Sequence, residues 1–169
     1  MKEWIKDIGI AVIIGILLLQ VIKPTIVKEH SMEPTLHSND YIFLSKQAYR
    51  FGTPEYGDII VFHTDLTRED GKEKLLIKRI VALGGDTVSI TGGVVYRNGE
   101  PVNEAYTLDG YTATEMEEIT VPEGHAFVMG DNRQNSIDSR DPRVGFLDLD
   151  EVVGKAVFRL YPFRDIGLL

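Results

Sequence analysis

Ser31 is the first residue in the sequence whose surroundings suggest chemistry. It lies in the segment EHSMEPTL (29–36), in which Pro34 fixes its own backbone angle and biases Glu33 toward an extended geometry. The hydroxyl of such a serine can attack a carbonyl group only when a neighbouring base takes its proton. A serine near a proline is more often an ordinary turn residue, because short motifs of this kind match many unrelated proteins. The identity of the base therefore decides between a nucleophile and a turn residue.

The strongest candidate for the base is Lys78, in the segment LLIKRIVAL (75–83). Lys78 and Arg79 interrupt an otherwise apolar run, and the alternation of a strand puts them on opposite faces. An arginine cannot give up its proton in a protein, whereas aliphatic neighbours lower the pKa of a lysine by desolvating it. We therefore predict that Lys78 is the base and that Arg79 faces water or a carboxylate. The alternative is an edge strand in which both charges oppose aggregation.

The histidines are weaker candidates for the base. His30 neighbours Ser31 in the sequence, but adjacent side chains in an extended segment point to opposite faces. The other histidines, which have no recognisable motif around them, are His37, His63 and His125. Catalytic triads are assembled in space, so the spacing of these residues along the chain does not exclude them.

The segment GDNRQNSIDSRDPR (130–143) is the third group of residues with a possible role at a reactive site. Its charges balance, with three aspartates and three arginines: Asp131, Asp138, Asp141, Arg133, Arg140 and Arg143. A calcium loop is a poor match, because Arg133 occupies a ligand position and no glutamate closes the loop. The choice is then between a solvated turn and a loop ordered by charge-assisted contacts. We predict the ordered loop, as rigid support for an active site.

An apolar run near the N-terminus extends from Ile8 to Ile22, IGIAVIIGILLLQVI, with Gln20 as its only polar residue. As a helix it would be about 22 Å long, shorter than the ~30 Å apolar core of a bilayer, and Trp4 and Ile5 extend it. Lys23 and Pro24, which follow the run, close it at its other end.

Three interpretations of this run compete. A cleaved signal peptide needs a small-x-small cleavage site, which the following QVIKPTIV does not contain. A buried core helix should carry a polar face, whereas this run is apolar all round. We therefore predict that residues 1–23 are an N-terminal tip followed by one uncleaved transmembrane helix, over residues 4–23, in a lipid bilayer.

The rest of the chain, residues 24–169, consists of short segments rich in Val, Ile, Tyr and Phe. We predict strands at 41–45, 58–62, 75–83, 87–90, 94–97, 125–129 and 155–161. Gly92-Gly93 and Asn98-Gly99 indicate hairpin turns. Because no long stretch after residue 24 has helical periodicity, this domain is predicted to be mainly β, an antiparallel barrel or coiled sheets. Residues 98–122 are the most polar part, and we predict a loop-rich excursion there.

Composition and charge exclude several classes of function. The chain has 169 residues, enough for one domain with its own core, and a net charge of −8. This charge, and the absence of a basic stripe, argue against binding to nucleic acid. Without cysteine the chain cannot have a disulfide framework, a thiolate nucleophile or a cysteine-ligated zinc ion.

Five pieces of the sequence together resemble the type I signal peptidases, the serine–lysine proteases of bacterial protein export. In order, they are the N-terminal apolar run, SMEPTL, YGDIIVF, KRIVALGGDTV and GDNRQNSIDSR. The resemblance extends from about residue 4 to about residue 162, nearly the whole chain. The short chain and its compact excursion resemble the form found in Gram-positive bacteria.

This resemblance implies a role for each matching residue. Ser31 matches the nucleophile and Lys78 the general base of the dyad. Asp138 and Arg140 match a pair that supports the site, and Ser136 matches a serine that helps to orient the lysine. The implied reaction is cleavage of signal peptides through an acyl-enzyme, with no metal or organic cofactor. The N-terminus would be cytoplasmic and the β domain would lie on the outer face of the cell membrane.

The resemblance also implies the kind of substrate, an exported preprotein whose extended segment adds alongside a strand of the active site. Small side chains before the scissile bond would enter shallow apolar pockets, and Met32 and Ile77, next to the dyad, are candidate wall residues. One departure concerns Glu29, which stands where Gram-negative members have a serine in the oxyanion hole. The N–H of Ser31 would then have to serve as a donor.

Two other functions fit parts of the sequence. One is a different Ser–Lys protease, such as the self-cleaving domain of repressors that respond to DNA damage. The predicted anchor and the lack of a DNA-binding segment count against it. The other is a membrane-anchored β binding module without catalysis, in which Ser31 is a turn residue and Lys78 an edge charge. Cleavage of a preprotein peptide would distinguish these alternatives from a signal peptidase.

Overall fold

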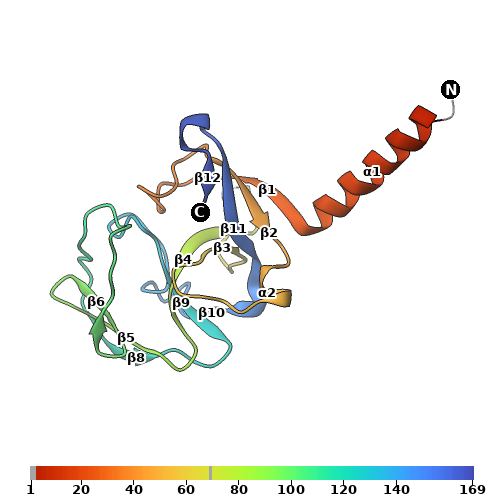
Figure 1. Ribbon diagram of the computed structural model, residues 1–169. Helices are drawn as coiled ribbons and strands as arrows, with labels where there is room; N and C mark the ends of the chain where they lie inside the picture. Colours follow the sequence, from red (N-terminus) through yellow and green to blue (C-terminus); the bar gives the residue numbers. More distant parts are fainter. Residues whose placement is uncertain (1–2, 69) are drawn as a thin grey trace.

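The computed structural model describes residues 3–68 and 70–169, and it is built mainly from antiparallel strands (Figure 1). This confirms the predicted fold class for the part of the chain after the N-terminal helix. The helical segments are short apart from the first one: α1 (Glu3–Val21), α2 (Ala48–Phe51), and the 3-10 helices η1 (Leu149–Glu151) and η2 (Phe163–Asp165).

The larger of two sheets in the described residues carries the predicted reactive residues. Its strands lie in the order β1 (Ile22–Ile26), β2 (Tyr41–Ser45), β11 (Val152–Tyr161), β3 (Ile59–Phe62), β4 (Leu76–Leu83), β9 (His125–Met129) and β10 (Leu147–Asp148), and β12 (Gly167–Leu168) pairs with β11. Strand β4 lies between β3 and β9, and the side chains of Lys78 and Arg79 are almost fully buried, so these two charges do not protect an exposed edge from aggregation.

The smaller sheet has the strand order β7 (Glu100–Pro101), β6 (Val94–Arg97), β5 (Thr87–Thr91) and β8 (Met116–Thr120). The predicted turn at Gly92-Gly93 joins β5 to β6, and both glycines have positive φ angles. The predicted excursion at 98–122 is only partly irregular, because β8 lies within it and pairs with β5.

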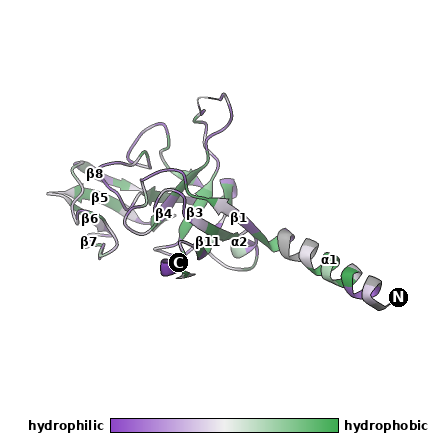
Figure 2. Cartoon of the chain, turned by 90° about the horizontal axis from the view of Figure 1, so that it is seen from above, coloured by the Kyte–Doolittle hydropathy of each residue, from purple (hydrophilic) through white to green (hydrophobic). Residues whose placement is uncertain are grey.

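Helix α1 projects away from the two sheets (Figures 1 and 2). A helix therefore lies where the sequence predicts a transmembrane helix, but it ends at Val21 and not at Lys23. Ile22 and Lys23 belong to β1, where they pair with Ser45 and Leu44 of β2. None of the helices in the described part of the chain has the length together with the apolar character that crossing a membrane requires.

The apolar core consists of three buried clusters. The first packs β2, β3 and β11 against the segment after Ser31, with Met32 and Leu36 fully buried. The second joins the two sheets and includes Val88, Val95, Phe127 and Met129. The third lies between β3, β4, β9 and β10: Ile60, Phe62, Leu76, Ile80, Ala126, Val128 and Leu147. Burial of these side chains holds β4 and β9 in place. It thereby positions Lys78, which lies in β4, and the loop that follows β9, and both of these contact Ser31.

Candidate active site

Ser31 and Lys78 meet in the interior of the protein. Lys78 Nζ donates a hydrogen bond to Ser31 Oγ over 2.7 Å, and a second one to the carbonyl of Ile77 over 2.9 Å. Ser31 is 4% exposed and Lys78 is 0% exposed. The side chain of Lys78 shares its face of β4 with the buried Leu76 and Ile80, as the alternation in the sequence predicts. The two residues thus have the contact that a nucleophile and its base require.

The buried position changes the acidity of the lysine. Burial lowers the pKa of Lys78 to about 8 from its ordinary value of 10.5, and the charge of Lys74 contributes in the same direction. The negative charges of Asp138, Glu29 and Asp131 act against this shift. A large fraction of Lys78 is then neutral at mildly alkaline pH, and the neutral amine can accept a proton from Ser31.

The histidines next to the reactive segments have other partners. His30 Nδ1 lies 2.7 Å from Glu33 Oε1, and the side chain of His30 is 60% exposed. His63 Nδ1 lies 2.6 Å from Glu73 Oε1. His125 Nδ1 lies 3.0 Å from the carbonyl of Glu123. Lys78 is therefore the basic side chain that contacts Ser31.

Asp138 and Arg140 form a buried ion pair near Lys78. Arg140 Nε lies 2.8 Å from Asp138 Oδ1, and Arg140 Nη2 lies 2.8 Å from Asp138 Oδ2. The backbone N–H of Gly130 also donates to Asp138 Oδ2, over 2.9 Å. Burial alone would raise the pKa of Asp138, but the hydrogen bonds and charge of Arg140 outweigh it and lower this pKa. The carboxylate is therefore ionised. It binds the N–H of Gly130 at the start of the turn and the side chain of Arg140 at its end, and so holds the two ends together.

Gly130 is where this turn touches the nucleophile. A Cβ atom at Gly130 would lie 2.5 Å from the carbonyl oxygen of Ser31 and would collide with Ser136 Oγ. The N–H of Asn132 donates to the same Ser31 carbonyl over 3.0 Å. Ser136 Oγ is buried, and its hydroxyl is among the groups that lower the pKa of Asp138. Ser136 therefore lies beside the nucleophile's backbone, whereas the hydrogen bonds of Lys78 go to Ser31 and Ile77.

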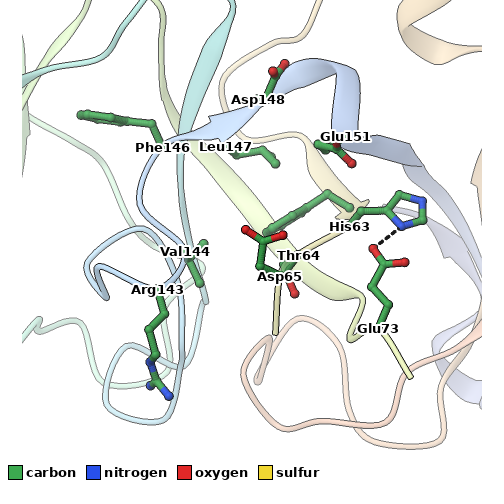
Figure 3. A pocket seen from close by; sticks show the side chains of 11 residues that line it. His63, Thr64, Asp65, Glu73, Arg143, Val144, Phe146, Leu147, Asp148 and Glu151 are labelled. Carbon is green, nitrogen blue, oxygen red and sulfur yellow. Dashed lines mark hydrogen bonds and ion pairs between the residues drawn. The ribbon is translucent and has the colours of Figure 1, made fainter. Parts of the chain in front are cut away.

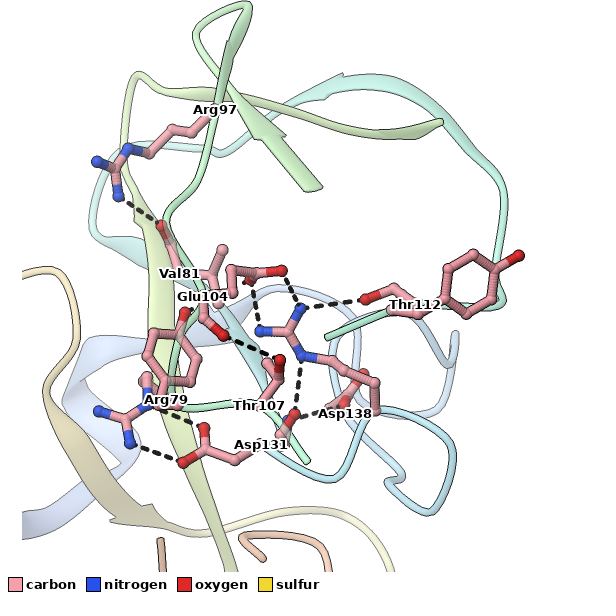
Figure 4. A network of polar contacts seen from close by, with 12 residues as sticks. Arg79, Val81, Arg97, Glu104, Thr107, Thr112, Asp131 and Asp138 are labelled. Atoms are coloured by element: carbon pink, nitrogen blue, oxygen red, sulfur yellow. Dashed lines mark hydrogen bonds and ion pairs between the residues drawn. The ribbon is translucent and has the colours of Figure 1, made fainter. Parts of the chain in front are cut away.

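Arg79 and Asp131 form a second ion pair at the site, which the sequence did not predict as a pair (Figure 4). Arg79 donates from Nε to Asp131 Oδ1 over 2.8 Å, and from Nη2 to Asp131 Oδ2 over 2.6 Å. The hydroxyl of Thr35 donates to Asp131 Oδ2 over 2.5 Å. The sequence predicted that Arg79 faces either water or a carboxylate, and in the structure it faces a carboxylate. The pair connects β4, the SMEPTL turn and the loop after β9.

A cleft lies next to β4, beside the segments that precede Ser31 and Lys78. It has a volume of about 290 Å³, and its walls are the segments 25–29 and 73–77 together with Val61 and Arg68. Neither Ser31 nor Lys78 lines the cleft, but one wall ends two residues before Ser31 and the other ends one residue before Lys78. Ile77 lines this cleft, whereas Met32 is fully buried in the core cluster with Val27 and Leu36. Of the two candidate wall residues, only Ile77 reaches the cleft surface.

A further cavity of about 250 Å³ lies beside His63, and neither Ser31 nor Lys78 lines it (Figure 3). Its walls carry several carboxylates from separate segments: Asp65, Glu73, Asp148 and Glu151. In the chain as described, no group of three or more His, Cys, Asp or Glu residues is arranged to hold a metal ion. The reactive geometry of this molecule is the one around Ser31 and Lys78.

The sequence of this chain is similar to those of known proteins. A family model described as signal peptidase, peptidase S26, matches residues 1–161. A probable signal peptidase I-1 from Synechocystis is 40% identical over 99% of this chain and 86% of its own length. A signal peptidase I from Bacillus licheniformis is 36% identical over 97% of this chain and 90% of its own. A solved signal peptidase I from Enterococcus faecalis aligns with 60% of this chain and 95% of its own, at 30% identity and a TM-score of 0.47.

Proposed function

This chain belongs to the signal peptidase family, peptidase S26, and from this premise we propose that it cleaves signal peptides from exported preproteins with a Ser31–Lys78 dyad. The observation that carries the proposal is the 2.7 Å hydrogen bond between Lys78 Nζ and Ser31 Oγ in a buried site. The buried environment, which lowers the pKa of Lys78 to about 8, favours the neutral amine that this chemistry needs.

The reaction is acyl transfer in two steps. Neutral Lys78 takes the proton of Ser31 as Oγ attacks the carbonyl carbon of the scissile peptide bond. The protonated lysine then gives a proton to the departing amine, and the bond between carbonyl carbon and nitrogen breaks. In the second step Lys78 deprotonates a water molecule, whose oxygen attacks the acyl carbon. The ester bond to Ser31 Oγ then breaks, Oγ takes the proton back from Lys78, and the carboxylic acid product leaves.

The oxyanion formed in each step needs hydrogen-bond donors. We assign this role to the backbone N–H of Ser31. Glu29 is unsuited to it, because its carboxylate lies 2.6 Å from Lys74 Nζ and forms an ion pair there. Asp138 and Arg140 support the site by holding the turn at Gly130, which presses against the carbonyl of Ser31. We propose that Ser136, which lies next to the same carbonyl, orients the reacting groups when substrate is bound.

The substrate would bind as an extended segment in the cleft between residues 25–29 and 73–77. Strand β4 pairs with β3 through residues 76–79, but its pairing with β9 begins only at Arg79. The other edge of β4 before Arg79 therefore has no strand partner among the described residues, and a substrate strand can pair with it. The apolar wall at Ile77 suits small side chains before the scissile bond.

We further propose that α1 attaches the enzyme to the cell membrane, with its N-terminus in the cytoplasm and the β domain on the outer face. Two observations support attachment. The sequence from Ile8 to Ile22 is almost entirely apolar, and the side chains of Ile8, Ile13 and Ile14 are exposed on a helix that projects from the sheets. Such surface is unfavourable in water and favourable in lipid. Alkaline carbonate extraction of membranes should leave the full chain in the pellet. Its release into the supernatant would contradict attachment.

Cleavage of a synthetic preprotein peptide with small residues before the cleavage site tests the function. The wild-type chain should cut after the small-x-small sequence, and Ser31→Ala should be inactive. A matched peptide with a bulky residue before the scissile bond serves as the control, since it cannot enter the cleft. Binding of the peptide without cleavage would favour a binding module instead.

A further inference from the structure

The segment between β7 and β8 leaves the smaller sheet and packs against the loop that follows β9 (Figure 4). The N–H of Leu108 donates to the carbonyl of Asp131 over 3.1 Å, and Gln134 Nε2 donates to the carbonyl of Tyr111 over 3.0 Å. Arg133 Nη1 donates to Thr112 Oγ1 over 3.1 Å. This part of the excursion is therefore fixed to the same loop that supports the nucleophile.

The strongest of these connections joins Glu104 to Arg133. Glu104 Oε2 lies 2.7 Å from Arg133 Nη1, and Glu104 Oε1 lies 2.5 Å from Arg133 Nη2. The side chain of Arg133 is 1% exposed and that of Glu104 is 14% exposed. A guanidinium buried to this extent requires a partner, because an unpaired charge in the interior is strongly unfavourable. Glu104 is that partner, although it comes from the polar excursion.

Tyr106 adds a second connection from the same segment. The Cζ atom of Arg79 lies 4.2 Å from the centre of the Tyr106 ring, and the Cζ atom of Arg133 lies 5.9 Å from it. The ring thus contacts the arginine next to Lys78 in sequence and the arginine that pairs with Glu104. A cation over an aromatic face is attracted to it, most strongly where water is excluded.

Arg133 connects Glu104 and Tyr106 to the backbone that contacts Ser31. Its Nε donates to the carbonyl of Gly130 over 3.0 Å, and its own carbonyl accepts from Arg140 Nη2 over 2.8 Å. Gly130 packs closely against the carbonyl of Ser31, and the backbone N–H of Asn132 donates a hydrogen bond to the same carbonyl. A displacement of Arg133 would therefore move the backbone that holds Ser31 against Lys78.

We propose that Glu104 and Tyr106 are positioning residues for the Ser31–Lys78 dyad, through which the excursion holds the loop at Gly130–Arg133 in its reactive geometry. The inference rests on the proposed function and extends it to residues that do not touch the dyad. Neither residue lines the cleft assigned to the substrate, so we expect both to affect the chemical step and not substrate binding. Errors in the placement of reacting groups reduce kcat steeply, and displacements of about 1 Å cost on the order of 100-fold.

Two substitutions at Tyr106 distinguish the contribution of its aromatic ring to kcat from the contribution of its hydroxyl group. Tyr106→Phe keeps the aromatic face and loses only a 3.4 Å contact with Glu104, so kcat should stay within about 2-fold of wild type. Tyr106→Leu keeps an apolar side chain but removes the face, and kcat should fall about 10- to 100-fold while KM stays unchanged. Both are measured on the full chain with the preprotein peptide, well below the melting temperature of each variant.

Glu104→Asp provides a second and independent variant. Aspartate keeps the negative charge that Arg133 needs, but its side chain is one methylene shorter, so the carboxylate lies farther from Arg133. We therefore expect kcat to fall again while KM stays unchanged. The matched control is Glu100→Asp, the same change at an exposed residue of β7, which should leave both constants unaltered. If Tyr106→Leu does not fold, the Glu104→Asp result decides.

Wild-type kcat in Tyr106→Leu, or in a folded Glu104→Asp, would overturn the proposal, as would equal losses in Tyr106→Phe and Tyr106→Leu. A rise in KM at constant kcat would overturn it as well, since it would indicate a role in substrate binding. Failure of the wild-type chain to cleave the peptide would instead contradict the proposed function, so the two failures are distinguishable.

Discussion

Asp131 accepts hydrogen bonds from two nitrogens of Arg79, over 2.8 and 2.6 Å, and this ion pair connects the loop after β9 to the residue that follows Lys78. Asp131 is fully buried, and the side chain of Arg79 is 11% exposed. Removing one partner would leave a charge in the interior. Asp131→Ala should therefore lower the free energy of unfolding by about 3–5 kcal/mol, measured by urea denaturation.

The same loop offers a control for this prediction. Asp141 pairs with Arg143, but the side chain of Arg143 is 62% exposed, so water replaces the lost partner. Asp141→Ala should leave the denaturation midpoint almost unchanged. Equal losses of stability in Asp131→Ala and Asp141→Ala would contradict the claim that the buried Arg79–Asp131 pair matters more for stability than the exposed Asp141–Arg143 pair.

Asp138 should make stability depend on pH. Because the pKa of Asp138 is lowered in the folded protein, its contribution is complete above the ordinary value of 3.8 and is lost as pH falls through the folded-state pKa. Asp138→Asn should be less stable and less active than wild type at pH 7, and its stability should fall less steeply under acid. Thermal unfolding between pH 7 and pH 2 measures the difference. If activity disappeared while the melting temperature at pH 7 stayed at the wild-type value, Asp138 would have a direct catalytic role instead.

Gly130→Ala tests the close approach of the loop to the nucleophile. The new methyl group would lie 2.5 Å from the carbonyl oxygen of Ser31 and would also collide with the side chain of Ser136, so the contact between the loop and the backbone of Ser31 must change. We expect a fall of at least about 10-fold in kcat for the preprotein peptide, because the dyad loses its alignment. Gly167→Ala is the control, since no atom lies within 4 Å of its added Cβ. An unchanged kcat in Gly130→Ala would mean that the loop does not position Ser31.

Local patterns in the sequence were sufficient for the strands that hold the dyad. The alternation in LLIKRIVAL placed Lys78 among buried aliphatic side chains, and the structure has this arrangement in β4. The choice of lysine over histidine followed from the side chain's chemistry, and the 2.7 Å contact with Ser31 agrees with it. Strand β1 was missed because Pro24 and the polar residues around it resemble a linker. Its strand geometry comes from pairing with β2 at the edge of the sheet, where proline is tolerated.

The partners of charged side chains could not be predicted in the same way. Asp131 and Arg79 are far apart in the sequence, and no local pattern indicates that they pair. Glu104 lies in a polar segment that gave no sign of a buried residue, and its importance depends on Arg133 being brought to it by the fold. Such pairs are properties of tertiary structure, because burial decides whether a charge needs a partner.

The pH dependence of the reaction follows from the lowered pKa of Lys78, about 8. The base must be neutral, so kcat/KM should rise with pH through this value and then level off above it. An ordinary lysine would give a rise near pH 10.4. A profile of kcat/KM between pH 6 and pH 10.5 distinguishes the two. A rate that falls as pH increases from 7 to 9 would be incompatible with a neutral lysine as base.

The central claim is that Lys78 acts by accepting a proton, and kcat of Lys78→Arg for the preprotein peptide tests it most directly. The substitution keeps a positive charge and much of the side chain's length, but arginine cannot serve as a free base. We predict a loss of several orders of magnitude in kcat, equal to that of Lys78→Ala, while His30→Ala keeps most of the activity because its ring contacts Glu33. Substantial activity in Lys78→Arg, or its complete loss in a folded His30→Ala, would contradict the assignment of Lys78 as the base.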